Sequence, residues 1–326
     1  MRARLTLLPV TMVALLTAMT ILTGCGGERG GNGSEADGGR LSIATGNTTG
    51  VYYQLGGGYA RLIGQKIPGW TATAEATGAS VENIRRVVAG DSDIAFTLAD
   101  SAADAVNGKG SFSSPQPIRA LARIYTNYTQ VLVRSDAGIR NLAGLKGKPV
   151  STGSPNSGTE VIAVRLLAAA GLDPDRDVTR QKLSLPETVQ AMKDGTVKAM
   201  FFSGGLPTAG ITDLTTSLGD RVRFLDLSAE LPKMQAEFGP VYQPATIEPK
   251  VYEMPKPVAT IGVPNLLVVK DTMDAALAEK LTALLFEQQA ELVKVHPEAA
   301  NITRATATQT APVVLHPGSE KYFAGT

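Results

Sequence analysis

Two polar, glycine-rich loops carry the residue types that can hold an anion. In the first, residues 45–50 separate a short strand pattern from a helical pattern that begins at Val51. In the second, residues 151–159 separate a strand pattern from a helical pattern that begins at Glu160. A helix start presents unpaired backbone N–H groups at the positive end of the helix dipole, so each start can bind an anion. Such turns are common in α/β folds, but two of them on two lobes predict a site for a carboxylate-bearing ligand between the lobes.

The order of elements repeats after each loop. Ser80 and Ser184 are the predicted N-caps of two short helices, and strand patterns follow them at 93–96 and 197–202. The alternation of strands and helices predicts parallel sheets that bind ligands at the strand ends. The folded part, which we expect to begin near Arg40, is about twice as long as a typical domain, so two lobes are expected.

The N-terminus predicts a bacterial lipoprotein. Two arginines precede the apolar run 5–20, and the sequence Leu-Thr-Gly-Cys follows and ends at Cys25. We therefore predict that residues 1–25 are a signal peptide with its lipobox, and that Cys25 becomes the acylated mature N-terminus. The alternative is an N-terminal membrane anchor, because the run is nearly long enough to cross a bilayer. Residues 26–39 are rich in glycine and polar residues and predict a flexible tether.

Two strand patterns, at 125–134 and 259–269, are predicted to connect the lobes. Lobe one would then comprise residues 40–127 and 262–326, and lobe two, with the hinge strands, residues 128–261. Lobes joined in this way can close around a ligand by a hinge motion.

Three further segments carry local predictions. A long helix is predicted over 273–295, and its leucines recur at helical spacing, which indicates packing against lobe one. The proline-rich segment 232–264 predicts an irregular surface excursion. Three successive glycines at 56–58 interrupt the first helix, each at a cost of roughly 1 kcal/mol relative to alanine. They predict the close approach of another backbone or a ligand, and a frayed helix is the alternative.

Composition and missing motifs exclude several function classes. The formal net charge is +1 and no basic patch is evident, so nucleic-acid binding is not expected. Cys25 is the only cysteine and His296 and His316 are the only histidines, so a disulfide framework, a CxxC metal site and a histidine-based triad are not predicted. No P-loop, GxGxxG, HExxH, GxSxG or EF-hand motif occurs, and no cofactor or metal is expected. No second long apolar run occurs, so a soluble body is expected.

An acid–base enzyme that uses carboxylates alone stays open as a less favoured alternative. Four aspartates cluster in the sequence, namely Asp91, Asp93, Asp100 and Asp104. We expect these aspartates to lie at the solvated surface, with Asp91 and Asp93 in a turn.

The sequence Thr-Gly-Asn-Thr-Thr-Gly-Val-Tyr-Tyr at 45–53 resembles the opening motif of the TAXI family. These proteins are the solute receptors of a subset of tripartite ATP-independent periplasmic (TRAP) transporters. The resemblance continues, in the family's order, through residues 78–84, 93–95, 119–122 with Tyr125, 136–139, 145–148, 157–160, and 315–318 with Tyr322 and Phe323. It covers nearly all of the chain after the tether, and the order of the pieces makes it specific.

The resemblance implies a type II periplasmic-binding fold of two α/β lobes joined by hinge strands. It also implies an extracytoplasmic receptor. We expect a monomer held at the membrane by the lipid on Cys25, and we do not expect an enzyme, because no nucleophile–base pair is evident. Such a receptor captures a small carboxylate and delivers it to the membrane permease subunits of a TRAP transporter, which an ion gradient drives. The expected ligands are glutamate or glutamine, or a C4–C5 dicarboxylate such as 2-oxoglutarate. A sensor or a protein-binding lipoprotein on the same scaffold is the alternative.

The expected ligand site combines the two loops with polar residues near the hinge. The α-carboxylate is expected at the first helix start, where the Thr48 and Thr49 hydroxyls would donate, and the second loop would close from the other lobe. The candidate ligand-binding residues are Asn47, Thr48, Thr49, Gly50, Val51, Tyr52, Ser80, Asn83, Asp100, Arg123, Tyr125, Ser157, Gly158, Thr159, Glu160, Phe202 and Gly204.

The chain departs from the family pattern at two places where ligand contacts are expected. Leu98 and Ala99 stand where the family often has a glutamine and a second polar residue, and Thr126 and Asn127 stand where it often has Pro-Glu. Glutamate is therefore not carried over as the ligand. Arg123 is a candidate partner for a second carboxylate, and a surface salt bridge is its alternative role.

Overall fold

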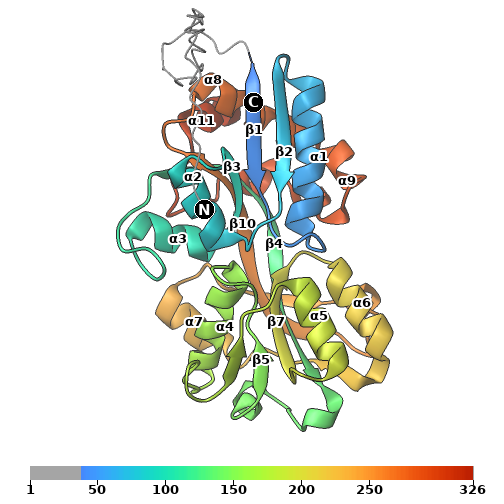
Figure 1. The fold of residues 1–326 in the computed structure, drawn as a ribbon. Helices are drawn as coiled ribbons and strands as arrows, with labels where there is room; N and C mark the ends of the chain where they lie inside the picture. Colours follow the sequence, from blue (N-terminus) through green and yellow to red (C-terminus); the bar gives the residue numbers. More distant parts are fainter. Residues whose placement is uncertain (1–37, 326) are drawn as a thin grey trace, which may run out of the picture. The chain divides into compact units, whose positions relative to one another are not determined.

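One mixed β-sheet runs through both lobes of the described chain (Figure 1). The structure is a computed structural model that describes residues 38–325, so the predicted signal peptide, Cys25 and nearly all of the predicted tether lie outside it. The strand order is β2-β1-β3-β10-β4-β7-β5-β6, with β8 beside β4 and β9 beside β10. The strands are β1 (Gly39–Ala44), β2 (Trp70–Glu75), β3 (Ile94–Leu98), β4 (Ile118–Arg134), β5 (Pro149–Ser151), β6 (Thr179–Gln181), β7 (Ala199–Gly204), β8 (Val222–Phe224), β9 (Gln243–Ile247) and β10 (Val258–Lys270). Gly39 therefore belongs to the first strand, and the prediction that it is part of the tether is wrong.

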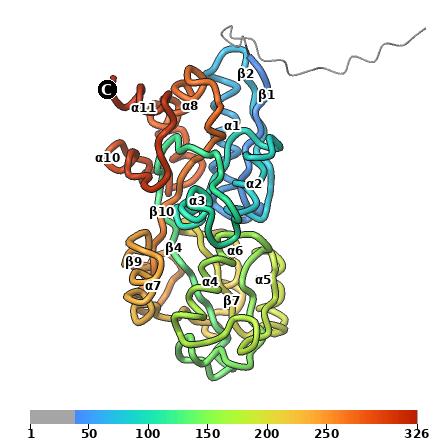
Figure 2. The backbone as a smooth tube through the Cα atoms, turned by 90° about the vertical axis from the view of Figure 1, so that its left-hand side faces the viewer, coloured from blue at the N-terminus to red at the C-terminus, as the bar shows by residue number. Residues whose placement is uncertain are grey.

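Two long antiparallel strands, β4 and β10, connect the lobes, and Figure 2 shows both passing from one lobe to the other. We call the half with β1–β3 lobe one and the half with β5–β7 lobe two. The strands within each trio pair in parallel, as predicted, whereas β10 pairs antiparallel with β3 and β4 antiparallel with β7. The sheet is therefore mixed, because the chain returns through its centre. The pairing of β4 with β10 is irregular between Pro264 and Leu266, since a proline has no N–H to donate to the ladder.

Helices cover both faces of the sheet in lobe one. The helices are α1 (Val51–Lys66), α2 (Ser80–Ala89), α3 (Ala99–Asn107), α8 (Ala275–Glu287), α9 (Gln289–Val293), α10 (Arg304–Ala307) and α11 (Pro317–Ala324). Helices α1, α8 and α9 share one apolar core, and α2 and α3 contribute to another. The predicted helix 273–295 is two helices, because the backbone departs from helical geometry at Gln288 (φ −109°, ψ 19°). Its leucines are buried in lobe one, as predicted, and share an apolar core with α1.

Lobe two has the same layered construction. Its helices are α4 (Gly158–Ala169), α5 (Leu185–Asp194), α6 (Ala209–Leu218) and α7 (Leu231–Phe238), and short 3-10 helices occur along the chain at Ser135–Ala137, Leu142–Leu145, Gly219–Arg221, Pro249–Val251 and Pro297–Asn301. Helices α4 and α7 pack in one apolar core and α5 and α6 in another.

The prediction of an irregular excursion over 232–264 is wrong. The segment contains most of α7, all of β9 and half of β10. Two of its prolines lie where regular structure tolerates them, since Pro232 is in the first turn of α7 and Pro244 is in β9, which pairs only with β10. Tyr242, between these elements, is fully buried.

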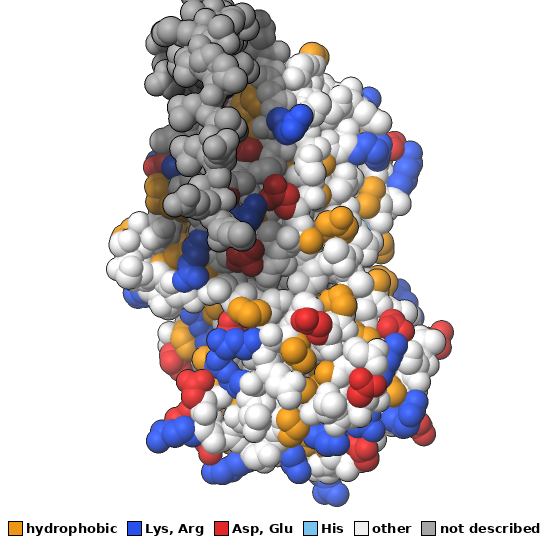
Figure 3. Space-filling view, viewed as in Figure 1, with side chains coloured by type: hydrophobic (Ala, Val, Ile, Leu, Met, Phe, Trp, Pro, Cys, Tyr) orange, Lys and Arg blue, Asp and Glu red, His pale blue; other side chains and the backbone are white. Residues whose placement is uncertain are grey.

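The surface of lobe two in Figure 3 intersperses basic and acidic side chains, without a patch of one sign on that face. This distribution agrees with the small net charge. Within residues 38–325, no helix is both long enough and apolar enough to cross a membrane.

The three glycines of α1 have different surroundings. A Cβ at Gly56 would lie 2.4 Å from Cγ2 of Thr45, and one at Gly58 would lie 2.8 Å from Cγ2 of Val295. No atom lies within 4 Å of the corresponding position at Gly57. The helix is continuous, so the frayed alternative is wrong, and the close neighbours are side chains rather than a backbone.

Gly57→Ala should therefore stabilise the protein. Alanine lowers the conformational entropy of the unfolded chain and meets no atom in the folded helix, so the free energy of unfolding should rise by up to about 1 kcal/mol. Urea denaturation measures this change. Gly56→Ala is the matched control and should destabilise, because its Cβ would overlap Thr45. A loss of stability in Gly57→Ala would contradict the interpretation.

Candidate ligand-binding site

A cavity lies between the lobes where four helices begin. Its walls include the first residues of α1 and α2 from lobe one and of α4 and α5 from lobe two. The predicted site residues that line it are Asn47, Gly50, Val51, Tyr52, Ser80, Tyr125, Ser157, Gly158, Thr159, Phe202 and Gly204. The cavity volume is about 40 Å³, room for about three water molecules. A ligand of amino-acid size therefore needs the lobes or the lining side chains to move apart.

The first loop leaves the start of α1 open to an anion. Gly50 is the N-cap in extended conformation and has no side chain to cap the helix, so the first N–H groups of α1 have no partner within it. Asn47 instead connects the lobes. Its Oδ1 accepts a hydrogen bond from the backbone N–H of Leu185 at 2.7 Å, and its Nδ2 donates to the Ser154 hydroxyl at 3.3 Å.

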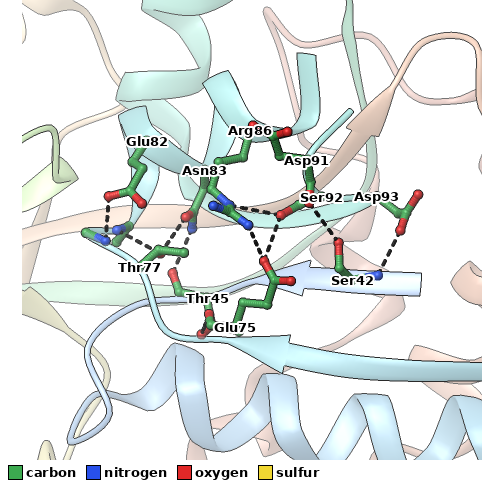
Figure 4. A network of polar contacts seen from close by, with 12 residues as sticks. Ser42, Thr45, Glu75, Thr77, Glu82, Asn83, Arg86, Asp91, Ser92 and Asp93 are labelled. Atoms are coloured by element: carbon green, nitrogen blue, oxygen red, sulfur yellow. Dashed lines mark hydrogen bonds and ion pairs between the residues drawn. The ribbon is translucent and has the colours of Figure 1, made fainter. Parts of the chain in front are cut away.

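The start of α2 is fixed by a polar network (Figure 4). The Asn83 amide donates to the carbonyl oxygens of Thr45 and Phe96 at 2.7 and 2.8 Å. Its Oδ1 accepts from the Thr77 hydroxyl at 2.6 Å. Asn83 does not line the cavity, so its predicted role as a ligand contact is not supported, and it positions the helix start instead.

Ser80 is the first residue of α2 and not its N-cap, which corrects the prediction. The N-cap is Ala79, with φ 81°, and it makes no side-chain cap. The Ser80 hydroxyl lines the cavity and accepts from the backbone N–H of Leu98 at 3.1 Å.

In lobe two, α4 begins at Gly158, two residues before the predicted start. Ser157 is its N-cap, and its hydroxyl accepts from the N–H of Glu160 at 2.9 Å. Glu160 does not line the cavity: it accepts from the N–H of Asn156 at 2.8 Å and pairs with Lys182 at 2.7 Å. Its predicted role at the ligand is therefore not supported. The predicted capping of α5 by Ser184 is confirmed.

Two buried hydroxyl groups in the cavity have no hydrogen-bond partner among the described residues. They belong to Tyr125, which is 2% exposed, and Ser203, which is 8% exposed. Tyr52, by contrast, donates to Oδ1 of Asn265, whose amide donates to Asn127 at 2.8 Å. Burial raises the pKa of both Tyr52 and Tyr125 above the ordinary tyrosine value, so both stay protonated donors.

Three other predicted contacts lie elsewhere. Thr48 is exposed, and the Thr49 hydroxyl lies beside α6, 3.2 Å from where a Cβ on Gly210 would be. Arg123 donates to Oε1 of Gln309 at 3.0 Å and does not line the cavity. Binding through the two threonine hydroxyls, or through the Arg123 guanidinium, is therefore not supported.

Asp100 is also outside the cavity, so its predicted role at the ligand is not supported. It lies in a buried cluster between the lobes, and the expectation of a solvated surface position is wrong for it. Its Oδ2 accepts from the Tyr242 hydroxyl at 2.7 Å and lies 3.7 Å from Nη1 of Arg165. Arg165, on α4, also pairs with Asp104 at 2.6 Å and lies over the Phe238 ring, 4.2 Å from its centroid. Burial is the largest influence on Asp100 and raises its pKa, while the Arg165 charge opposes that rise. The cluster joins α3 of lobe one to α4 of lobe two.

Sequence reasoning missed several lining residues as ligand contacts. They include Gly78, Leu98, Asn127, Ser154, Leu185, Thr188, Phe201 and Ser203. Leu98 and Asn127 are among the residues at which the chain departs from the family pattern. Ser203 had a usable signal, because it is at the carboxyl end of a predicted strand, where ligands of α/β proteins bind.

The model of the NMT1-like family matches residues 43–325 of this chain. The chain belongs to the NMT1-like family. The match spans both lobes and both connecting strands.

Among solved structures, this NMT1-like protein is similar to a binding-protein component of an ABC phosphonate transporter from Pseudomonas aeruginosa. That structure has a TM-score of 0.55 and 14% identity, over 81% of this chain and 79% of that one. An ancestral arginine-binding protein bound to arginine has a TM-score of 0.50 and 14% identity, over 80% and 97%. A Xanthomonas citri protein bound to ATP has a TM-score of 0.50 and 12% identity, over 87% and 98%. At these identities the likeness concerns the fold, and the predicted type II periplasmic-binding fold is confirmed.

Both histidines of this NMT1-like protein act as helix caps. Nδ1 of His296 accepts from the N–H of Glu298 at 3.1 Å, and Nδ1 of His316 accepts from the N–H of Gly318 at 3.2 Å. Burial lowers the pKa of both rings, so neutral imidazoles are favoured. Neither histidine lines the cavity. Within residues 38–325, no group of three or more His, Cys, Asp or Glu side chains could hold a metal ion.

Proposed function

We propose that this protein is an extracytoplasmic solute receptor that closes on a small carboxylate between its lobes. The convergence of four helix starts on one cavity carries the proposal, because helix starts present a partial positive charge to an anion and the start of α1 has no side-chain cap. The hydroxyls of Tyr125 and Ser203, which have no partner in the described part of the chain, would give the ligand further hydrogen bonds. The family match and the periplasmic-binding fold support a binding role.

We further propose delivery to the membrane subunits of a TRAP transporter, with the receptor held at the membrane by a lipid on Cys25. The motif at 45–53 and its ordered continuation support the first part, and the lipobox sequence supports the second. Use by an ABC-type transporter is the second candidate, because the phosphonate-transporter component shares the fold.

A thermal-shift screen tests the ligand class. The protein is first unfolded and refolded by dialysis to remove carried-over ligand, and is then screened with amino acids, C3–C5 carboxylates, alkylphosphonates and alkanesulfonates. One carboxylate should raise the melting temperature selectively, since a ligand at 100 times its Kd stabilises the folded state by about 2.7 kcal/mol. No shift with any carboxylate would contradict the proposal, and a shift with a phosphonate alone would favour the second candidate.

A further inference from the structure

The cavity can stabilise one negative charge on a ligand but not a second. Of the described residues that line it, none has a charged side chain. Arg123 and Arg165 interact with other residues of the protein, since Arg123 donates to Gln309 and Arg165 pairs with Asp104. The start of α1 has no side-chain cap and can hold one carboxylate. The starts of α4 and α5 are capped by Ser157 and Ser184, and that of α2 already carries the carboxylate of Glu82. A second ligand carboxylate buried without a cation would therefore lose its hydration without compensation.

The unpartnered hydroxyl of Tyr125 lies in a region where a second negative charge would be repelled. A Cβ placed on Gly205 would lie 3.0 Å from Cε2 of Tyr125 and 2.7 Å from Cγ of Glu298. Both side chains therefore lie beside Gly205. Glu298 accepts from the N–H of Leu206 at 2.6 Å and from Asn301 at 2.8 Å. A ligand group that bonds the Tyr125 hydroxyl is therefore close to an acidic side chain.

The remaining walls are apolar or neutral. Leu98, Phe201 and Phe202 line the cavity, and the Leu98 methyl group reaches the start of α4, where it would lie 2.5 Å from a Cβ on Gly158. Together with the hydroxyls of Tyr125 and Ser203, these walls suit a tail that is uncharged and can form hydrogen bonds.

We infer that the ligand is a carboxylate whose tail has no second negative charge and ends in a neutral hydrogen-bonding group, such as an amide, a keto or a hydroxyl group. The inference rests on the proposed function and narrows its ligand class. It excludes the dicarboxylates and glutamate as ligands. It retains analogues in which a neutral group replaces the second carboxylate.

Isothermal titration with isosteric pairs tests this inference on the refolded protein. The pairs are succinate and succinamate, glutarate and glutaramate, and glutamate and glutamine, in which an amide replaces one carboxylate at nearly constant size. The amide member of the best-binding pair should bind at least 10-fold more tightly than its dicarboxylate partner. Equal or tighter binding of the dicarboxylate would overturn the inference and leave the proposed function intact. Binding of no carboxylate at all would overturn the proposed function itself.

Two variants test which hydroxyls bind the polar tail. Tyr125→Phe and Ser203→Ala each remove a hydroxyl that has no partner within residues 38–325, so neither should lower the melting temperature of the ligand-free protein. At least one of them should weaken binding of the preferred amide about 5-fold or more, and neither should affect a plain alkanoate that lacks the polar tail. Tyr59→Phe is the matched control: its hydroxyl donates to the carbonyl oxygen of Leu281 at 2.7 Å, outside the cavity, so affinity should not change. Unchanged affinity for the amide in both cavity variants would overturn the inference.

Discussion

Replacing Arg165 with leucine is expected to lower the free energy of unfolding by about 3–5 kcal/mol at neutral pH. Arg165 is the cation that faces Asp100, whose side chain is fully buried, and it also pairs with Asp104 at 2.6 Å. Leucine would leave two carboxylates close together in a protein interior with no positive charge between them. The loss of the cation–π contact with Phe238 adds to the effect. Urea denaturation at pH 7 measures the change.

The loss of stability in Arg165→Leu should become smaller as the pH falls. Burial already raises the pKa of Asp100, and the Arg165 charge holds that rise down, so its removal should raise the pKa further. The folded variant then binds a proton more tightly than the unfolded chain does, and its stability relative to the wild type should improve as the pH falls from neutral toward 5. A deficit that grows as the pH falls would contradict the argument.

A double variant separates charge from packing. Adding Asp100→Asn to Arg165→Leu should restore a large part of the lost stability, because it removes the more deeply buried of the two unpaired charges while the Tyr242 hydroxyl keeps an acceptor. Arg176→Leu is the matched surface control. Its partner Asp173 is three residues away and the arginine side chain is 85% exposed, so no measurable change is expected.

The local parts of the fold could be predicted from the sequence because their causes are local. The cap of α5 needs only Ser184 and Glu187, three residues apart, and Gly90 ends α2 in the left-handed conformation that glycine adopts freely. The mixed sheet was not predicted, because the antiparallel pairing of β4 with β10 joins residues more than 120 positions apart. The break at Gln288 and the burial of Tyr242 also depend on contacts distant in the sequence.

The site was predicted in its position and less well in its chemistry. The helix starts line the cavity because the loop composition and the strand–helix order determine where they lie. The roles of Asn83, Asp100 and Glu160 were assigned from motif membership, yet each side chain is occupied by a partner within the protein. For Asp100 that partner is Arg165, which a single sequence does not link to it.

Gly78→Ala is expected to weaken ligand binding about 5- to 150-fold, the equivalent of roughly 1–3 kcal/mol of overpacking. Gly78 lines the cavity from lobe one, and a Cβ there would lie 2.8 Å from the carbonyl oxygen of Pro155 in lobe two. That oxygen belongs to the backbone, so it cannot rotate away as the end of a side chain can. Within lobe one the Cβ would also lie 2.6 Å from Oε2 of Glu82, which is the end of a flexible side chain and can shift. The overlap with the Pro155 backbone remains, so the closed arrangement should be destabilised more than lobe one itself.

A substitution in lobe two should hinder closure of the lobes in the same way. A Cβ on Gly158 would lie 2.6 Å from the Ser80 hydroxyl, which is held in place by the N–H of Leu98. Gly158→Ala should therefore also reduce the affinity measured by titration, with little change in the melting temperature of the ligand-free protein. Gly57→Ala, in the open environment on α1, is the control and should leave the affinity unchanged. If both cavity variants bound the ligand as tightly as the wild type, the ligand would not require closure of the two helix-start loops upon it. The ligand would then be bound with the lobes farther apart than in the arrangement described.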